Sequence, residues 1–565
     1  MVPAPDAPPV GAKLLDPATG RCTFRVWAPA HDQVTLVLDP DGTAPRRVAF
    51  RPEADGYHAV SLDGVAPGDR YVFEAAGEQR PDPASLSQPD GVHAPSAVVS
   101  LDYPWTDAGF AAPPLADALF YELHVGTFTD EGTLDAAIEH LDELVDLGIT
   151  VVELMPVAQF PGARNWGYDG VYPFAVQSSY GGPRALIRFV DAAHARGLAV
   201  ALDVVYNHLG PEGNYLGWYA PDFFTDRYRT PWGDAVNLDG PGSDAVRGFL
   251  LRNALHWFEH FHVDVLRLDA VHALYDRSAM PFLEELAAAV EVRSAALERP
   301  LYLVAESDAN DARLITARSQ GGTGMHAVWA DDLHHALHRR LTGETQHYYV
   351  DYPDLSHLAD ALRDGFAYTG QHSPFRGRRH GRPPGALAAS RFVVCSQNHD
   401  QVGNRMRGER LSALVDLERL KLAAATVLLS PHVPLLFMGE EYGETAPFPY
   451  VVDHGDPDLL EAVRQGRAAE FDHPVGADDG PPDPAHPETF ASAVLDRGLR
   501  RHPAHAALRA LYRQLIHLRR DTAALQHPDH ARHLVAHLDD PPLVISHRWF
   551  GEAHALILLH FGAAP

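Results

Sequence analysis

The sequence predicts a multidomain α/β protein in which a (β/α)8 TIM barrel is flanked by an N-terminal β-sandwich and a small C-terminal antiparallel β domain. Three observations support this fold class. Short strand-like runs fill the first hundred residues, strand-like and helix-like segments then alternate eight times, and three further strand-like runs end the chain. A chain of 565 residues is also too long for one compact domain and suggests about three.

The predicted sandwich covers residues 1–100. Its runs CTFRVWAPA, QVTLVLD, RRVAFRP, GYHAVSL and RYVFEA alternate in part between apolar and polar residues, with Pro, Gly and Asp between them. This pattern is typical of antiparallel strands with one buried face. The Pro-rich stretch that follows, RPDPASLSQPDGVHAPSAVVSLDYPW, predicts an ordered linker.

The predicted barrel covers residues 101–525, with loop insertions. Its strands are LFYELHVGTF, VVELMPV, LAVALDVVYNH, VDVLRLDAVH, LYLVAES, MHAVWADD, SRFVVCSQ and VPLLFMG. The first segment between them, LDAAIEHLDELVDLG, predicts one helix that ends at Gly148. Its buried stripe is Leu134, Ile138, Leu141 and Val145. A doubly wound sheet would show the same alternation, but eight units with polar clusters at their strand ends favour a barrel.

Residues 526–565 contain the runs RHLVAHL, LVISHRW and HALILLHF, which predict a three-stranded antiparallel sheet. So few strands leave an exposed edge. We expect a domain that is either incomplete or docked on the barrel, and the sequence leaves both alternatives open.

The charge of the chain limits its partners. Lys and Arg number 46 against 75 Asp and Glu, a formal net charge of −29. Because such a surface repels phosphate backbones and anionic membranes, we expect no nucleic-acid partner and no membrane partner, whereas a neutral substrate meets no such barrier. Lys13 and Lys421 are the only lysines, and no nucleotide-binding P-loop is present.

The location that the sequence predicts is cytoplasmic. Cys22 and Cys395 lie far apart in sequence and suggest no disulfide framework, which fits a reducing compartment. The first residues, MVPAPDAPPVGAKLL, do not resemble a secretion signal, and no later run is long and apolar enough to span a membrane. Nothing in the sequence indicates an oligomeric state.

Three carboxylates directly follow predicted strands: Asp269, Glu306 and Asp400. If these strands belong to one barrel, the acids converge at its C-terminal rim. Glycoside hydrolysis needs such a set, with one acid to protonate the leaving oxygen and another to attack the sugar. Any one of these acids alone would be explained as a strand-to-loop boundary, but the set, with the polar ends of neighbouring strands, favours catalysis.

The surroundings of the three acids suggest different charges. Arg267 shares a strand face with Asp269 and should favour its charged form. The apolar residues before Glu306 should raise its pKa and keep a proton available for a leaving group. Asp400 follows His399 and is suited to bind sugar hydroxyls and to stabilise positive charge on the ring.

Other polar and aromatic residues in these clusters are suited to bind a sugar. His208 and His399 are expected to act as uncharged donors or acceptors, and Tyr168 or Trp166 could stack on a sugar face. His334 and His338 lie one helical turn apart and could bind a metal. No third ligand is evident, so we predict neither a metal nor a cofactor.

The motifs DVVYNH, LRLDAVH, LVAES and QNHD resemble the four signature regions of the α-amylase family, glycoside hydrolase family 13. The resemblance implies a retaining mechanism with Asp269 as nucleophile, Glu306 as general acid/base and Asp400 as transition-state stabiliser. It also implies that Arg267, His208 and His399 surround the glucose at the cleavage point, that Asp203 and Asn207 support the site, and that Tyr168 is the stacking aromatic. We add three neighbouring residues to this substrate-binding set: Trp166, His272 and Asn398.

Loops carry a closer resemblance, to the malto-oligosyltrehalose trehalohydrolase family. It includes ELMPVAQFPGARNWGYDG, TPWGDAVNLDGPGSD, ADDLHHALHRRLTGE and QNHDQVGNR. The resemblance implies hydrolysis of the α-1,4 bond next to the terminal trehalose unit of malto-oligosyltrehalose and related α-1,4-glucans, without a cofactor. It further implies a carbohydrate-binding type of N-terminal sandwich.

Two alternatives use the same residues. A glycogen branching enzyme would pass the glycosyl-enzyme to a sugar hydroxyl, and a catalytically dead barrel would only bind glucan. The pair His272–Ala273 stands where many amylases have Lys-His. We expect this exchange to open space for trehalose on the leaving-group side.

Overall fold

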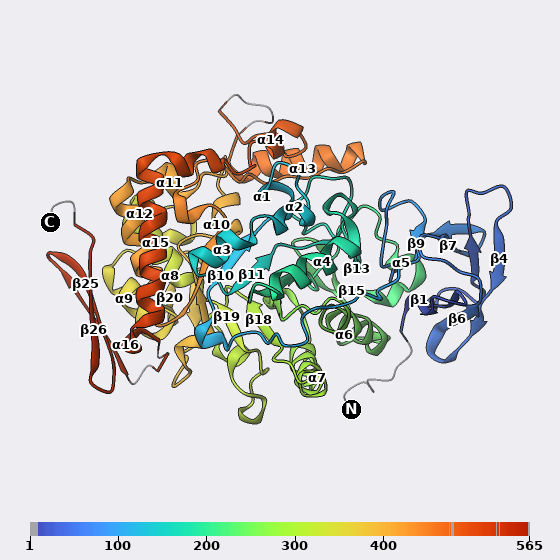
Figure 1. The fold of residues 1–565 in the computed structure, drawn as a ribbon, viewed down its shortest axis with the longest axis horizontal. Coiled ribbons are helices and arrows are strands. Elements are labelled where there is room, and N and C mark those ends of the chain that lie inside the picture. Colours follow the sequence, from blue (N-terminus) through green and yellow to red (C-terminus); the bar gives the residue numbers. More distant parts are fainter. Residues whose placement is uncertain (1–8, 474, 476–478, 527, 530–531, 563–565) are drawn as a thin grey trace.

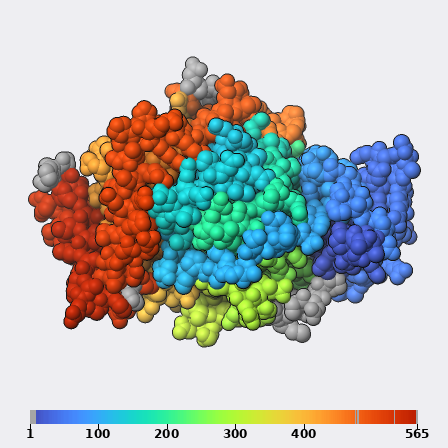
Figure 2. Space-filling view, in the orientation of Figure 1, coloured from blue at the N-terminus to red at the C-terminus, as the bar shows by residue number. Residues whose placement is uncertain are grey.

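The computed structural model describes residues 9–473, 475, 479–526, 528–529 and 532–562. Residues 1–8, 474 and 476–478 lie outside the described residues. Residues 1–8 belong both to the predicted sandwich and to the N-terminal segment that was considered as a secretion signal. Three regions follow one another along the long axis of the molecule (Figure 1). The N-terminal sheets lie at one end, the barrel in the middle and the C-terminal sheet at the other end, and the barrel is in contact with both (Figure 2).

Eight parallel strands close into a barrel in the order predicted from the sequence. They are β10 (Phe120–Leu123), β11 (Val151–Leu154), β14 (Ala199–Val204), β17 (Val265–Leu268), β18 (Tyr302–Glu306), β19 (Ala327–Trp329), β22 (Phe392–Val394) and β23 (Val433–Phe437). Apolar side chains fill the barrel interior, among them Phe120, Val265 and Trp329. The TIM-barrel prediction is confirmed, and the doubly wound alternative is wrong.

Helices surround the barrel. The main ones are α3 (Leu141–Leu147), α4 (Gly182–His194), α6 (Ser243–His260), α7 (Phe282–Leu297), α8 (Asp331–Thr342), α9 (Leu355–Asp364), α12 (Leu417–Leu428) and α15 (Pro503–Asp521). The other helices are α1 (Val125–Phe128), α2 (Leu134–Ile138), α5 (Leu216–Tyr219), α10 (His399–Gly403), α11 (Leu411–Leu414), α13 (Pro457–Glu470), α14 (Pro487–Ala491) and α16 (Ala523–Gln526).

Two predictions about helices are wrong. The single helix expected over LDAAIEHLDELVDLG is broken between α2 and α3, and this break changes the helical phase. Val145 is therefore 41% exposed instead of lying on the buried stripe. Gly148 ends α3 as predicted, in a left-handed conformation with φ 102°. The segment ADDLHHALH, treated as a loop, forms the start of α8 directly after β19.

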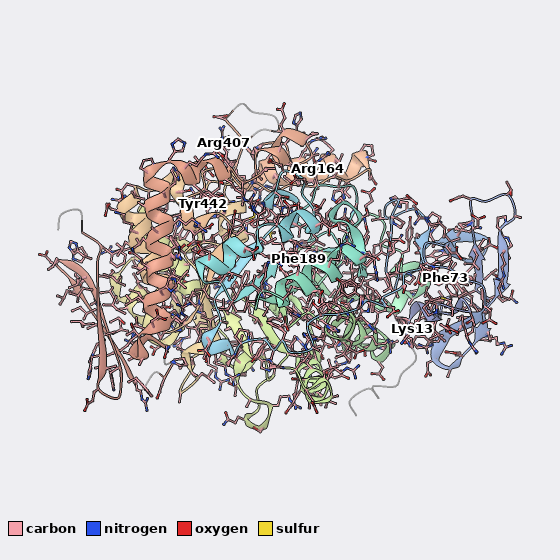
Figure 3. The ribbon with its side chains drawn as sticks, viewed as in Figure 1. Lys13, Phe73, Arg164, Phe189, Arg407 and Tyr442 are labelled. Carbon is pink, nitrogen blue, oxygen red and sulfur yellow. The ribbon has the colours of Figure 1, made fainter. Side chains whose placement is uncertain are left out.

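The N-terminal region packs two antiparallel sheets face to face, as predicted. One contains β1 (Gly11–Asp16), β2 (Arg21–Trp27), β6 (Tyr57–Leu62) and β5 (Arg51–Pro52). The other contains β4 (Arg46–Ala49), β3 (Thr35–Leu38), β7 (Arg70–Ala75) and β8 (Glu78–Arg80), with β9 (Ser96–Ala97) paired to β7. Tyr219 of the barrel region enters the core between these sheets and packs with Phe73. Figure 3 labels Phe73 there and Phe189 on α4.

The linker between sandwich and barrel is ordered, as predicted. Trp105 stacks on His262 with ring centroids 3.8 Å apart. Asp107 accepts hydrogen bonds from His194 and His262 at 2.9 and 2.7 Å. These contacts fix the linker along the base of the barrel.

The C-terminal sheet contains β24 (His533–Asp539), β25 (Pro542–Phe550) and β26 (Ala553–His560), all antiparallel as predicted. Val544 and Leu559 are buried beneath it. The guanidinium of Arg548 donates hydrogen bonds to carbonyl oxygens of Leu429, Ser430 and Leu525. The sheet is therefore docked on the helices that surround the barrel.

Candidate active site

The predicted acids lie at the carboxyl ends of neighbouring barrel strands. Asp203 on β14 pairs in register with Arg267 on β17, and Glu306 is the last residue of β18. Asp269 follows β17 by one residue, and its N–H donates to Val204 O at 3.1 Å. In parallel barrel strands, residues two apart face the same side, which brings these side chains together inside the rim.

Arg267 is the centre of the site and is fully buried. Its Nη1 donates to Asp203 Oδ2 at 2.7 Å and to Asp269 Oδ1 at 2.9 Å. Its Nη2 lies 3.7 Å from Glu306 Oε2, and its guanidinium stacks over Trp329 at 4.2 Å. One buried cation therefore brings three of the predicted carboxyl groups together.

Asn207 orients Asp269 from the other side. Its Nδ2 donates to Asp269 Oδ2 at 2.8 Å and to the Asp269 carbonyl at 2.9 Å. Both carboxylate oxygens of Asp269 thus accept hydrogen bonds from fixed donors. Such a carboxylate is held in a single orientation, as a nucleophile requires.

Glu306 accepts a hydrogen bond at Oε2 from the N–H of Ala270 at 2.6 Å. Ala270 adopts a left-handed conformation with φ 40°, which aims this N–H at the neighbouring strand. Burial raises the pKa of Glu306 well above its usual range, Arg267 opposes this effect, and Asp269 and Asp400 add to it. The expectation of a raised pKa is confirmed, and Oε1 is the oxygen suited to carry the proton.

Asp400 lies on α10, with its side chain 41% exposed. Asn398 Oδ1 accepts hydrogen bonds from the N–H groups of Asp400 and Gln401, at 2.9 and 3.4 Å. Asn398 is itself 1% exposed, so it caps the helix that carries Asp400 and does not face a substrate. The prediction of Asn398 as a substrate-binding residue is corrected on this ground.

His399 differs from its prediction in charge. Its Nδ1 lies 2.5 Å from Glu122 Oε1, and its Nε2 lies 2.7 Å from Tyr168 Oη. Burial alone would lower the pKa of His399, but the carboxylates of Glu122 and Asp400 raise it to about 9. His399 is therefore a cation at neutral pH, and the expectation of an uncharged ring is wrong.

The two aromatic candidates have different positions. Tyr168 packs against the His399 ring with centroids 5.2 Å apart, and its hydroxyl donates to Asp203 Oδ2 at 2.7 Å. Trp166 is 4% exposed, stacks on Phe448 and donates its indole N–H to Pro449 O at 3.0 Å. Trp166 therefore supports the site from behind, and its prediction as a stacking platform is corrected.

His208 lies beside the nucleophile candidate. Burial lowers its pKa, which agrees with the predicted uncharged ring. The ring stacks on Trp232, at a centroid distance of 4.6 Å and an angle of 8°. Trp232 is 50% exposed and was missed, because it lies in the hairpin of β15 (Phe224–Thr230) and β16 (Gly233–Val236), away from any strand-end cluster.

The pair after the nucleophile region has one exposed member. The His272 side chain is 38% exposed, and its Nδ1 lies 3.8 Å from Asp308 Oδ1. Ala273 is buried, with 5% exposure. His272 is therefore the more exposed member of the pair, and the expectation that this pair opens space for trehalose stays a prediction.

Asp331 is a further acid that the sequence reasoning missed, although it follows β19 just as the other acids follow their strands. Its Oδ1 accepts a hydrogen bond from Gln401 Nε2 at 3.3 Å. Burial raises the pKa of Asp331 to about 7, and the nearby Asp400 adds to the shift. Asp331 therefore interacts electrostatically with Asp400, one of the predicted catalytic acids.

The histidines considered as metal ligands have protein partners. His334 Nδ1 lies 2.6 Å from Ser396 O, and its Nε2 lies 3.1 Å from Tyr349 Oη. His338 Nε2 lies 2.8 Å from Glu344 Oε2. Within the described residues, no group of three or more His, Cys, Asp or Glu side chains is arranged to hold a metal ion.

Comparisons with known proteins agree with this architecture. Residues 9–89 match carbohydrate-binding module 48 (isoamylase N-terminal domain), and residues 87–220 match the alpha-amylase catalytic domain. A crystal structure of a provisionally assigned alpha amylase from Salmonella typhimurium superposes with a TM-score of 0.90 at 40% identity, covering 98% of this chain and 93% of that one. Fold and site therefore define a glycosidase of the alpha-amylase class.

Two curated relatives refine this class. Malto-oligosyltrehalose trehalohydrolase from Rhizobium sp. (strain M-11) is 45% identical over 558 residues, covering 97% of this chain and 92% of the relative. The protein of the same name from Arthrobacter ramosus is 48% identical over 505 residues, covering 88% and 87%. The chain belongs to the malto-oligosyltrehalose trehalohydrolase family. A branching enzyme from Bordetella parapertussis is 29% identical over 473 residues, covering 74% of this chain and 60% of the relative.

Proposed function

We propose that the protein is a 4-alpha-D-((1->4)-alpha-D-glucano)trehalose trehalohydrolase, which cleaves the α-1,4 bond next to the terminal trehalose unit of malto-oligosyltrehalose. The products are trehalose and a shorter malto-oligosaccharide, as in trehalose biosynthesis. The observation that carries the proposal is the contact of one buried guanidinium, Arg267, with Asp203, Asp269 and Glu306 in a barrel of this family.

The proposed mechanism retains the anomeric configuration. Asp269 attacks the anomeric carbon while Glu306 protonates the leaving glycosidic oxygen, which gives a covalent glycosyl-enzyme and free trehalose. Ionised Glu306 then removes a proton from water, which attacks the same carbon and frees Asp269. Asp400, whose side chain is exposed to a substrate, stabilises positive charge on the ring and binds its hydroxyls. A retaining pair of carboxyl groups is expected to lie about 5–5.5 Å apart.

Incubation with malto-oligosyltrehalose tests the activity directly. We expect trehalose and the shortened malto-oligosaccharide as products, with little cleavage of a plain malto-oligosaccharide of equal length. Chromatography identifies the products, and NMR spectra taken early in the reaction should show the α-anomer first. New α-1,6 branches would instead support the branching enzyme, and binding without products would support the catalytically dead barrel.

His272 is proposed to contact the leaving trehalose unit, because it is the exposed member of the pair after the nucleophile. His272→Ala should lower kcat/KM for malto-oligosyltrehalose roughly 3- to 10-fold, the value of one hydrogen bond, and should affect plain malto-oligosaccharide less. The ratio of the two kcat/KM values is the measurement. An unchanged ratio would remove His272 from the substrate-binding set.

The division into residues 1–100, 101–525 and 526–565 and the cytoplasmic location are also proposals. The two cysteines are buried and not paired with each other, which fits the location. None of the helices in the described part of the chain has the length and apolar character that a membrane crossing requires.

A further inference from the structure

Two buried glutamates lie next to each other beneath the site, on the first two strands of the barrel. Glu122 on β10 and Glu153 on β11 are partners in the parallel register, and each is 1% exposed. Nothing in the sequence analysis singled out either residue. Their hydrogen bonding differs completely, although their positions are equivalent.

Glu122 uses both carboxylate oxygens to hold His399. Its Oε2 accepts from the His399 backbone N–H at 3.0 Å, and its Oε1 lies 2.5 Å from His399 Nδ1. Because Oε1 belongs to a carboxylate, the Nδ1 that faces it must carry a hydrogen. Glu122 therefore fixes both the backbone and the ring of His399.

Tyr168 determines the state of the other ring nitrogen. Its hydroxyl donates its single hydrogen to Asp203 Oδ2 at 2.7 Å, so its oxygen can only accept from His399 Nε2 at 2.7 Å. His399 Nε2 must then also carry a hydrogen. With Glu122 and Asp203 ionised, these hydrogen bonds require a proton on both ring nitrogens, so His399 is an imidazolium.

Glu153 has the opposite character. Both of its carboxyl oxygens are buried without a hydrogen-bond partner among the described residues. An ionised carboxylate in that position would be costly, since its charge would be neither solvated nor paired. Burial raises the pKa of Glu153 well above its usual range, and the charge of Glu122 adds to the shift.

We propose that Glu122 is a positioning residue that keeps His399 doubly protonated. The protonated ring holds Tyr168 in place and puts a positive charge beside Asp400. Glu153, in contrast, holds a proton and contributes no charge. The Nε2 of His399 lies 3.5 Å from Asp400 Oδ1, so the positive charge is placed directly beside this carboxyl group. The catalytic part of this inference rests on the proposed function.

The groups that face His399 come from several elements. Carboxyl groups are contributed by Glu122, Glu153 and Asp203 from the strands and by Asp400 from α10, and Arg267 is the opposing cation. The neutral or weakly basic neighbours are Tyr168, Trp166, Trp329 and His124. Of the carboxyl groups, Glu122 alone hydrogen-bonds to both the ring and the backbone, so removing its charge should have the largest effect.

Glu122→Gln and Glu153→Gln make a matched pair, since each removes one carboxyl at equal size in the same layer of the barrel. In the folded protein, His399 has a pKa of about 9, so it keeps its second proton at neutral pH and loses it near pH 9. In Glu122→Gln that pKa should fall by about 1–3 units, the effect of one close opposite charge. In Glu153→Gln it should stay unchanged, because a neutral side chain replaces a neutral one.

The titration of His399 is measured by 15N NMR of the imidazole nitrogens, with His399→Gln used to assign its resonances. This readout does not depend on activity, so it separates a failure of the inference from a failure of the proposed function. Equal shifts in both variants would overturn the proposal. A pKa of His399 near 6.5 in the wild-type protein, the ordinary value for histidine, would also overturn the proposal. This measurement needs only the wild-type protein and can be made even if Glu122→Gln does not fold.

Turnover of maltosyl fluoride gives the kinetic counterpart. Fluoride leaves without a proton, so the alkaline limb of kcat/KM with this substrate does not report the proton of Glu306. In Glu122→Gln the limb should move to lower pH by about 1–3 units, with Glu153→Gln following the wild type. A uniform loss of rate at all pH values in Glu122→Gln would indicate a merely structural role and contradict the proposal.

Discussion

Replacing Asp269 with Asn is expected to abolish turnover of malto-oligosyltrehalose, with kcat falling roughly 10⁴-fold or more, the scale of losing a catalytic nucleophile. The amide has the shape of the carboxylate but cannot attack an anomeric carbon. Arg267 and Asn207 each donate to one of the two carboxylate oxygens, so the amide NH2 must face one of these donors and lose that hydrogen bond. Single-turnover kinetics measure the loss, and calorimetry with the intact substrate should show that glucan binding remains.

Asp135→Asn provides the control for this experiment. Asp135 forms a half-exposed ion pair with Arg188 on the outer surface, and such pairs contribute about 0–1 kcal/mol to stability. Its removal should leave kcat unchanged. Substantial turnover by a pure preparation of Asp269→Asn would refute the assignment of the nucleophile, whatever the control shows.

Replacing Glu306 with Gln should lower kcat on malto-oligosyltrehalose by about 10²- to 10⁴-fold, the contribution of general acid catalysis. The glutamine keeps the acceptor oxygen for the Ala270 N–H but has no acidic proton for the leaving glycosidic oxygen. Formation of the glycosyl-enzyme from maltosyl fluoride should therefore be nearly normal, because fluoride needs no protonation. The release of fluoride in a pre-steady-state burst is the measurement.

The second half-reaction makes this prediction sharper. Glutamine cannot take a proton from water, so the glycosyl-enzyme should accumulate after the burst and appear by mass spectrometry of the intact protein. Azide, which needs no base, should restore turnover as a glycosyl azide. If the burst from maltosyl fluoride is as slow as cleavage of malto-oligosyltrehalose, Glu306 is not the acid.

The barrel strands and the acids at their ends could be predicted because their signals are local. Each strand is a short apolar run, and Arg267 and Asp269 lie two residues apart at the end of one strand, so no tertiary information is needed to bring them together. The break between α2 and α3 could not be predicted, because the apolar spacing continues across it. A change of helical phase at two polar residues leaves no mark on such a pattern.

The errors at His399 and Trp166 have a common physical cause, which is the distance along the chain to the residues that contact them. The partner that makes His399 a cation, Glu122, lies 277 residues away in sequence. Trp166 is covered by Phe448 from the last barrel loop, so its NWGYDG context alone suggests an exposed ring. Charge state and exposure depend on contacts of this kind, whereas the identity of a strand-end acid does not.

The hydrogen bond from Ala270 to Glu306 has a consequence for how the site can change in evolution. Its donor is a main-chain N–H that directly follows the residue proposed as nucleophile, so the spacing of the two acids is set by the backbone of one strand end. A main-chain donor does not depend on the chemical nature of its own side chain, provided that the new residue can adopt the left-handed conformation of Ala270. The loops that determine substrate specificity can therefore vary widely in sequence, while the relative position of Asp269 and Glu306 stays the same.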